Sequence, residues 1–339
     1  MMKRFSVRQD WTRALLAAAV ATQATTSGAQ APTTMPASSA RAHAPAVLEG
    51  YAMTSDSVRL WYRAVGTGKQ TIIAGAANYF QKSLDALATP GRRVVTYDIR
   101  GRGKTDSVPP SKMGIVEFDA SDVDVIRKAV GADSVIVLGW SGGALSTVQY
   151  ALRYPAHVAQ MILLTPVGPR WVPWWDEMRK NGAAHIDTAA NTQLKARVKA
   201  GEFANDEAAL CRASAKAGLS GNWRVTSRIG AAPDVCDSPN ELPGRYGDFV
   251  PRLLAKLGKY DWRTDLPNVK ARTLVIHGEL DNPPLGGSEE WATGIPGARL
   301  LVIKGVGHWP HYEKPERTLG AIRAFLDGGW PKGSQVVHQ

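Results

Sequence analysis

The chain has 339 residues, enough for an α/β domain with an insertion, and its 44% hydrophobic content with 11 tryptophans excludes a disordered protein. Its formal net charge of +11 at pH 7 would suit a nucleic-acid binder, but the basic run at 100–104 has no interleaved aromatic residues and no nucleic-acid motif beside it. We therefore expect no nucleic-acid partner.

The N-terminus has the three parts of a secretory signal peptide. Basic residues precede the apolar run 14–21, and small residues follow at 27–31. The apolar run is far below the ~20 residues that span a bilayer, so we expect no integral membrane span. The sequence predicts a signal peptide over 1–29, cleaved after Ala29, a flexible Pro/Ala/Ser/Thr-rich linker over 30–46, and export to the periplasm or the medium. A disordered or organelle-targeting N-terminus is the alternative.

Beyond the linker, β-like and helix-like segments alternate as far as residue 166. The predicted strands are 47–53, 58–65, 71–75, 93–98, 134–139 and 160–166, with amphipathic helices at 118–130 and after residue 142. The alternation resumes with strands at 272–278 and 298–305 and a helix at 313–326. Such alternation is typical of a parallel sheet with helices on both faces. Residues 168–267 lack it and contain weak helices. The sequence thus predicts a core, 47–167 and 268–330, that carries a mainly helical lid at 168–267.

The two cysteines of the chain, Cys211 and Cys236, both fall in the predicted lid. An even number of cysteines in an exported protein favours a disulfide. Closing a loop of this size would stabilise the fold by roughly 3 kcal/mol. Two buried free thiols are the alternative.

The stretch from Gly139 to Gly143 reads G-x-S-x-G and lies between a predicted strand and a predicted helix. A serine on so tight a turn needs neighbours without bulk, and the helix directs its N-terminus toward the hydroxyl. In this context the motif predicts that Ser141 is a nucleophile rather than a loop residue.

A serine hydroxyl needs a base, and the base needs a carboxylate that orients it. His308 follows the last strand in a glycine-flanked loop and is our candidate base; His311 is a competitor that would otherwise be a surface residue, and His277 is expected to be structural. Asp281 and Glu279 both follow the preceding strand, and we favour Asp281, with a surface turn cap as its alternative role. The order Ser141, Asp281, His308 is the order that this architecture requires.

Four segments together resemble the serine hydrolases of the α/β-hydrolase superfamily: GWSGG, HGELD, GVGHWPHYEKPE and YDIRGRGKTD. The resemblance covers 47–166 and 272–326 and is greatest to the branch that holds the prolyl aminopeptidases. It implies an α/β-hydrolase fold with a mostly parallel central sheet flanked by helices. The family usually has His-Gly after its third strand, where this chain has Ala74-Gly75. Because the oxyanion donors are backbone amides, the resemblance still assigns them to Ala76 and Gly142.

The substrate is predicted only in outline. Tryptophans that could line an aromatic pocket, or simply pack the lid, are Trp140, Trp171, Trp174, Trp175 and Trp223. We expect an ester or lactone hydrolase first and an aminopeptidase second. The second activity would need a lid carboxylate for the substrate ammonium, with Glu202, Asp206 and Glu207 as candidates. All three triad candidates are present, which argues against a non-catalytic binding protein. No motif indicates a cofactor or a metal site.

Overall fold

The computed structural model describes residues 46–242, 253 and 255–338. The predicted signal peptide over 1–29, and the predicted linker as far as residue 45, lie outside the described residues. Residues Ala44–Gln339 form one compact unit. Among the described residues, no helix is long and apolar enough to cross a membrane.

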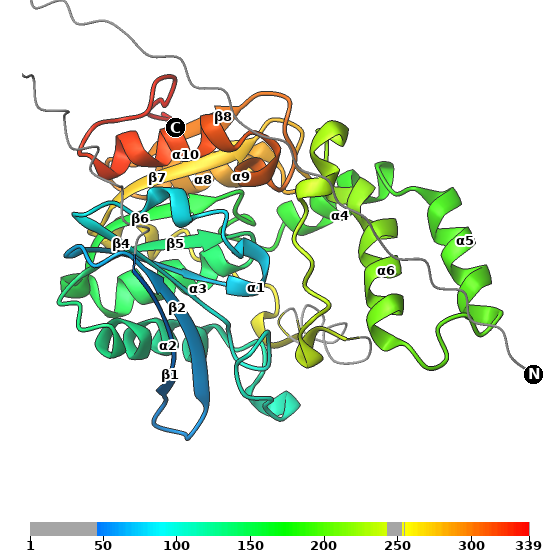
Figure 1. The fold of residues 1–339 in the computed structure, drawn as a ribbon. Coiled ribbons are helices and arrows are strands. Elements are labelled where there is room, and N and C mark those ends of the chain that lie inside the picture. Colours follow the sequence, from blue (N-terminus) through cyan, green and yellow to red (C-terminus); the bar gives the residue numbers. More distant parts are fainter. Residues whose placement is uncertain (1–45, 243–252, 254, 339) are drawn as a thin grey trace, which may run out of the picture. The chain divides into compact units, whose positions relative to one another are not determined.

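An eight-stranded sheet runs through this unit (Figure 1). Its strands along the chain are β1 (Val47–Met53), β2 (Arg59–Val65), β3 (Gln70–Gly75), β4 (Arg92–Tyr97), β5 (Val135–Trp140), β6 (Val158–Leu164), β7 (Arg272–Gly278) and β8 (Arg299–Ile303). Their order across the sheet is β1-β2-β4-β3-β5-β6-β7-β8. β2 is antiparallel to both β1 and β4, and the strands from β4 to β8 pair in parallel. This confirms the predicted mostly parallel sheet.

The parallel strands carry nearly continuous apolar sequence because both faces of the sheet are covered. Ile73 of β3 lies opposite Val137 of β5, which in turn lies opposite Met161 of β6, and all three side chains are buried. Parallel pairing brings the carboxyl ends of β3, β5, β7 and β8 to one edge of the sheet. Loops that follow these strands can therefore meet.

Helices from different parts of the chain cover the two faces. One face carries α2 (Val116–Ala129), α3 (Gly143–Arg153) and α8 (Leu285–Gly294), and the other α1 (Ala77–Phe80) and α10 (Pro315–Leu326). The predicted final helix over 313–326 is divided into α9 (Pro310–Glu313) and α10, because Pro315 disfavours helical backbone at the residue before it. Short 3₁₀ turns occur at Asp85–Leu87, Pro110–Lys112, Pro155–His157, Thr226–Ala231, Pro239–Glu241 and Leu266–Asn268.

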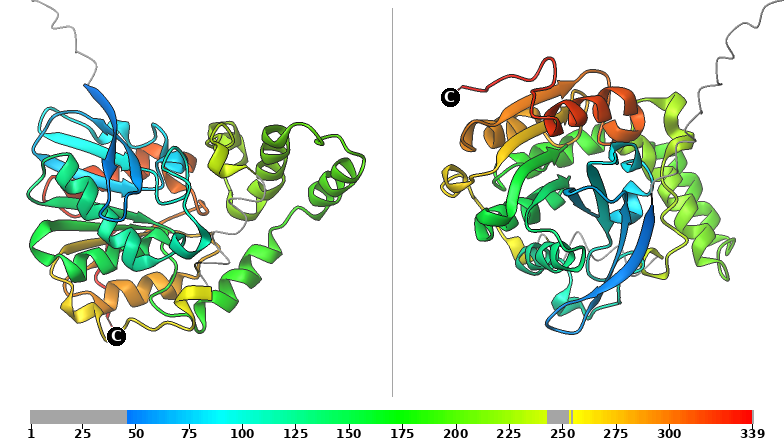
Figure 2. Two further views of the ribbon diagram at one scale, coloured as in Figure 1. Left: turned by 90° about the horizontal axis from the view of Figure 1, so that it is seen from below. Right: turned by 60° about the vertical axis from the view of Figure 1, so that its left-hand side comes forward.

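The described part of the stretch 168–267, which we call the insertion, includes the helices α4 (Trp174–Ala184), α5 (Thr188–Lys199) and α6 (Glu207–Asn222). Figure 2 shows α5 and α6 side by side. Asp187 and Asp206 cap α5 and α6 by accepting hydrogen bonds from backbone N–H groups three residues later. Cys211 and Cys236 are joined by a disulfide with a Cα–Cα distance of 5.8 Å, as predicted. The exact lid boundaries stay a prediction.

Helix α2 differs from its predicted form in what it buries. Ala129 is an apolar residue of the predicted amphipathic helix over 118–130, yet it is exposed. The buried side of α2 instead includes the acids Asp119, Asp122 and Asp124. Two of these carboxylates are stabilised by arginines: Asp122 pairs with Arg100 and Asp124 with Arg127. Counting apolar residues in the sequence does not identify this buried side of α2, because its charges are buried as ion pairs.

Candidate active site

Ser141 occupies a sharp turn between β5 and α3. Its φ of 55° lies in the left-handed region, which few non-glycine residues adopt. The turn depends on Gly139, since a Cβ there would lie 2.4 Å from the Thr147 hydroxyl oxygen. Gly143 is different, because a Cβ there would meet nothing within 4 Å. Packing therefore requires a glycine at position 139 of the motif but not at position 143.

Asp281 and His308 come from the loops after β7 and β8, which are in direct backbone contact. The N–H of Leu280 donates to the carbonyl of Val306 at 2.9 Å. A Cβ on Gly278 would lie 2.2 Å from the carbonyl oxygen of Gly307. The close approach of these two loops brings the carboxyl of Asp281 to the imidazole of His308.

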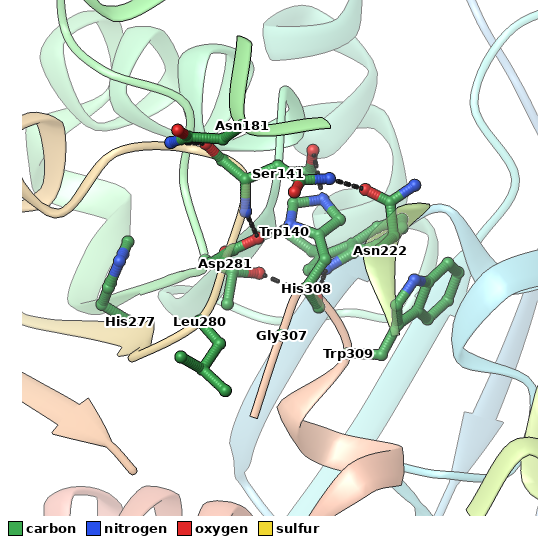
Figure 3. Close-up of polar contacts among 12 residues, drawn as sticks. Trp140, Ser141, Asn181, Asn222, His277, Leu280, Asp281, Gly307, His308 and Trp309 are labelled. Carbon is green, nitrogen blue, oxygen red and sulfur yellow. Dashed lines mark hydrogen bonds and ion pairs between the residues drawn. The ribbon is translucent and has the colours of Figure 1, made fainter. Parts of the chain in front are cut away.

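The three candidate side chains form one chain of hydrogen bonds (Figure 3). His308 Nε2 lies 2.9 Å from the Ser141 hydroxyl oxygen, and His308 Nδ1 lies 2.9 Å from Asp281 Oδ1. A carboxylate can only accept, so Nδ1 carries the proton and Nε2 is left to accept the serine proton. Both His308 and Asp281 are buried, at 8% and 9% exposure. This arrangement is able to remove a proton from the Ser141 hydroxyl.

Two backbone amides flank the serine in the position expected for oxyanion donors. Ala76 follows β3 with a φ of 66°, and Gly142 follows Ser141. Both residues line the same cavity as Ser141. Among the described residues, neither N–H group has a hydrogen-bond acceptor. The two amides are thus available to a ligand oxygen.

Asp98 anchors the loop that contains Ala76. Its carboxylate accepts hydrogen bonds from the N–H groups of Asn78 and Lys104, each at 2.8 Å. Burial nevertheless raises the pKa of Asp98 to about 6, because desolvation of the charge outweighs the two hydrogen bonds. Asp98 therefore connects the β3 loop to the loop after β4.

A cavity of about 630 Å³ opens at Ser141 and His308. Its walls are largely apolar, and one side of α4 covers it with Trp175, Met178 and Ala183. Trp140, Trp175 and Trp309 line it, whereas Trp171, Trp174 and Trp223 are not among its lining residues.

The predicted tryptophans outside the cavity have packing roles. The ring of Trp171 stacks on that of Trp175 at 5.1 Å. Trp174 donates from its indole nitrogen to Glu290, and Trp223 donates to the carbonyl of Val225. The sequence left open whether Trp171, Trp174 and Trp223 line a pocket or pack the lid. In the structure they have packing roles.

The structure corrects the expectation that His311, if not the base, lies at the surface. His311 is 1% exposed, lies against Phe80, Trp309 and Tyr312, and has no hydrogen-bond partner for either ring nitrogen among the described residues. Burial lowers its pKa to about 3. It does not reach Ser141 as a base, because that position is occupied by His308.

His277 is buried as expected. Its Nδ1 lies 3.0 Å from the hydroxyl of Ser288, and burial lowers its pKa. It lies apart from the hydrogen-bonded chain of Ser141, His308 and Asp281 (Figure 3). Among the described residues, no group of three or more His, Cys, Asp or Glu side chains is arranged to hold a metal ion.

The insertion contacts the histidine loop through its backbone. The His308 N–H donates to the carbonyl of Asn222, the last residue of α6, at 2.9 Å. The carboxylate of Glu313, 2% exposed, accepts from four backbone N–H groups. These donors are Gly307, Trp309, Arg224 and Val225, at 2.8–3.2 Å. One buried carboxylate thus connects the loop of His308 to the insertion.

A second contact joins the insertion to the loop after β4. The guanidinium of Arg102 donates to the buried carboxylate of Glu241 at 2.8 Å, and the Gly103 N–H donates to the same carboxylate. Arg102 also lines the cavity.

Sequence reasoning missed several residues around the site. Trp309 was discoverable, because it adjoins His308. Asp119 also lines the cavity, and its spacing from Val123 and Ile126 places it on the buried stripe of α2. Nothing in the local sequence marks Asn222 or Glu313 as partners of the histidine loop, because those contacts join distant segments.

Known proteins similar to this chain include hydrolases. The family model described as alpha/beta hydrolase fold matches residues 73–315, more than half of the chain. The 2-hydroxy-6-oxononadienedioate/2-hydroxy-6-oxononatrienedioate hydrolase of Escherichia coli is 25% identical over 286 residues, covering 80% of this chain and 91% of that protein. The Paraburkholderia phymatum protein of the same name is 26% identical over 295 residues, with 83% and 93% covered.

Solved structures of the same fold include a proline iminopeptidase and an esterase. The proline iminopeptidase of Mycobacterium smegmatis has a TM-score of 0.61 at 20% identity, covering 83% of this chain and 98% of that one. The esterase of Exiguobacterium antarcticum has a TM-score of 0.60 at 18% identity, covering 83% and 100%. At these identities the likeness concerns the fold.

Proposed function

Because this chain belongs to the alpha/beta hydrolase fold family, we propose that it is an exported serine hydrolase that cleaves a carboxylic ester or lactone through an acyl-enzyme. The observation that carries the proposal is the hydrogen-bonded chain from Ser141 through His308 to Asp281, with both distances at 2.9 Å. That chain opens into a largely apolar cavity.

The proposed reaction has two halves. Ser141 Oγ attacks the carbonyl carbon while His308 Nε2 takes its proton, and the N–H groups of Ala76 and Gly142 hold the oxyanion. His308 then gives the proton to the leaving oxygen, and the C–O bond breaks. In the second half His308 takes a proton from water and the hydroxide attacks the acyl carbon. The bond from that carbon to Ser141 Oγ then breaks, His308 returns the proton to Oγ, and the acid leaves. Asp281 stabilises the imidazolium in both halves.

The placement of the lid carboxylates favours an ester or lactone over an N-terminal peptide. Glu202 forms an ion pair with Arg197, and Asp206 caps α6. Neither of them, nor Glu207, is among the lining residues of the cavity. An aminopeptidase needs a carboxylate beside the substrate ammonium, and these three do not supply it. The aminopeptidase activity therefore stays the second hypothesis and an arm of the test.

Two features support export. The first 29 residues have the composition of a signal peptide, and the Cys211–Cys236 disulfide is typical of proteins that leave the reducing cytoplasm. N-terminal sequencing of the protein recovered outside the cytoplasm should begin at Gln30. Recovery of the chain with its first residues intact in the cytoplasmic fraction would refute the export proposal.

Activity profiling tests the chemistry. We expect purified protein to hydrolyse p-nitrophenyl esters or lactones faster than proline or alanine p-nitroanilides, and a fluorophosphonate to label Ser141. The Ser141→Ala variant should lose labelling and about 10³- to 10⁶-fold in kcat. Ser107→Ala, a serine outside the cavity that hydrogen-bonds Asn240, is a matched control. Unchanged hydrolysis by Ser141→Ala would refute the mechanism, and faster cleavage of the anilides would favour the aminopeptidase.

A further inference from the structure

The cavity has a polar inner region that the proposed chemistry does not use. It is formed by the carboxyl of Asp119 on α2, the hydroxyl of Ser146 on α3 and the phenol of Tyr97 on β4, all of which line the cavity. Asp119 is 6% exposed. The contact that its carboxyl receives from Ser146 Oγ is long, at 3.5 Å, and among the described residues this carboxyl has no other hydrogen bond and no ion pair.

The charges around Asp119 leave its carboxyl without a cation of its own. The like charges of Asp122 and Glu117 on its own helix disfavour its ionised form, and Arg100, the cation that acts against them, is engaged by Asp122 and Asp56. Ser146 contacts it from α3, and Tyr97 of β4 lies near enough to interact with it electrostatically. Burial, with the nearby Asp122, raises the pKa of Asp119 to about 7. A buried carboxyl that lacks good partners is costly, and a ligand that donates to it would relieve that cost.

The distance from the nucleophile limits which part of a ligand can reach this region. Ser141 lies two residues before α3, and its carbonyl accepts from the Ala144 N–H, so the helical turn continues back to it. At about 1.5 Å per residue, the backbone of Ser146 therefore lies roughly 7 Å further along. An extended chain advances roughly 1.2 Å per bond, so about six bonds separate a carbonyl at Ser141 from a group beside Ser146 and Asp119. The walls of the cavity include the apolar side chains of Ile99 and Val123. An α-amino group, two bonds from the carbonyl carbon, is too short to reach.

We propose that Asp119, with Ser146 and Tyr97, forms a subsite for a hydrogen-bond donor, an amino or hydroxyl group, at the far end of a medium-length acyl chain. The inference rests on the proposed function, because it takes Ser141 as the atom that receives the acyl group. It assigns the acyl part to the inner region of the cavity, and it makes Asp119 a specificity-determining residue.

Three matched esters test the subsite by catalysis: p-nitrophenyl hexanoate, 6-hydroxyhexanoate and 6-aminohexanoate. We expect the wild type to prefer the two donor-bearing esters over hexanoate in kcat/KM. Asp119→Leu should lower both preferences by about 10- to 100-fold. Asp119→Asn, which keeps an acceptor oxygen and loses the charge, should lower the amino preference more than the hydroxyl preference. Glu117→Gln, an exposed carboxylate on the same helix, is the matched control and should keep both preferences.

A binding measurement keeps the subsite testable apart from catalysis. Hexanamide, 6-hydroxyhexanamide and 6-aminohexanamide can be titrated against Ser141→Ala by tryptophan fluorescence, since Trp140 and Trp175 line the cavity. We expect tighter binding of the two donor-bearing amides, and loss of that difference when Asp119→Leu or Ser146→Ala is added. Equal affinities for the three amides would overturn the subsite, whether or not the esters are cleaved. Loss of ester hydrolysis with the binding preference intact would refute the proposed function alone.

Discussion

The core and the insertion are held together in different ways. In the core, α3 buries Ala144, Leu145 and Val148 against the sheet, whereas α5 of the insertion has no buried residue. The rest of the insertion buries side chains such as Trp175 and Trp223, and it is held further by helix caps, a disulfide and polar contacts such as Arg102–Glu241. The difference teaches that the packed core supplies the strand ends from which Ser141, Asp281 and His308 project, while the insertion also holds the loop of His308 through the carbonyl of Asn222. The insertion supplies part of the cavity wall through Trp175 and Met178.

The largest expected effect is on kcat and follows from replacing Asp281, which lies in the core. Asp281→Asn should lower kcat by about 10⁴-fold, because an amide no longer holds the imidazole of His308 in the tautomer that accepts the serine proton. Glu279→Gln is the control: Glu279 is exposed and accepts from the Gly305 N–H. Steady-state kinetics on an ester decide the matter. Similar losses in the two variants would mean that the acid is misassigned.

Glu313 tests the connection between the two regions. Glu313→Ala leaves four buried or part-buried backbone N–H donors without this acceptor, two in the histidine loop and two in the insertion. We expect the free energy of unfolding to fall by about 4 kcal/mol, measured by urea denaturation. Glu316 on α10 is exposed, so the control variant Glu316→Ala should change the free energy of unfolding little. Equal stability of both variants would contradict the connecting role.

The disulfide tests the insertion side. The loop between Cys211 and Cys236 spans 25 residues, so replacing both by serine should lower the free energy of unfolding by about 3 kcal/mol. We expect hydrogen exchange to rise in α6 while β5 and β7 stay protected, because the core does not use this bond. Uniformly faster exchange across the sheet would show that the two regions are not separable in this way.

The smallest expected effect concerns acid sensitivity in the core. His311 has a folded-state pKa of about 3, against an ordinary value of 6.5. The unfolded chain therefore binds a proton first, and stability falls as pH drops from 6.5 toward 3, by about 1.4 kcal/mol per pH unit.

The variant His311→Phe keeps a ring against Phe80 and should remove this dependence. At pH 5 the wild type should have lost about 2 kcal/mol more than the variant, relative to pH 8. Denaturation at both pH values measures it. Parallel pH profiles for the two proteins would contradict the assignment.

Prediction from sequence succeeded where the signal is local. The bounds of β1 and β7 were predicted to the residue, because turn residues and glycines delimit them. It failed where burial depends on distant partners. From its sequence, His311 looks like an exposed loop residue. In the structure it is enclosed by the neighbouring Tyr312 and by two residues from distant segments, Phe80 and Trp140.

The sequence by itself determined the sheet, the disulfide-forming cysteines, and which serine, aspartate and histidine follow the strand ends. Periodicity and turn chemistry are local properties, and parallel pairing brings those strand ends to one edge. Only the tertiary structure decided which tryptophans face the cavity, that Asn222 holds the His308 backbone, and that Asp119 is buried there without an ion pair to any described residue. These outcomes depend on how segments far apart in the chain pack together, and no local pattern encodes that.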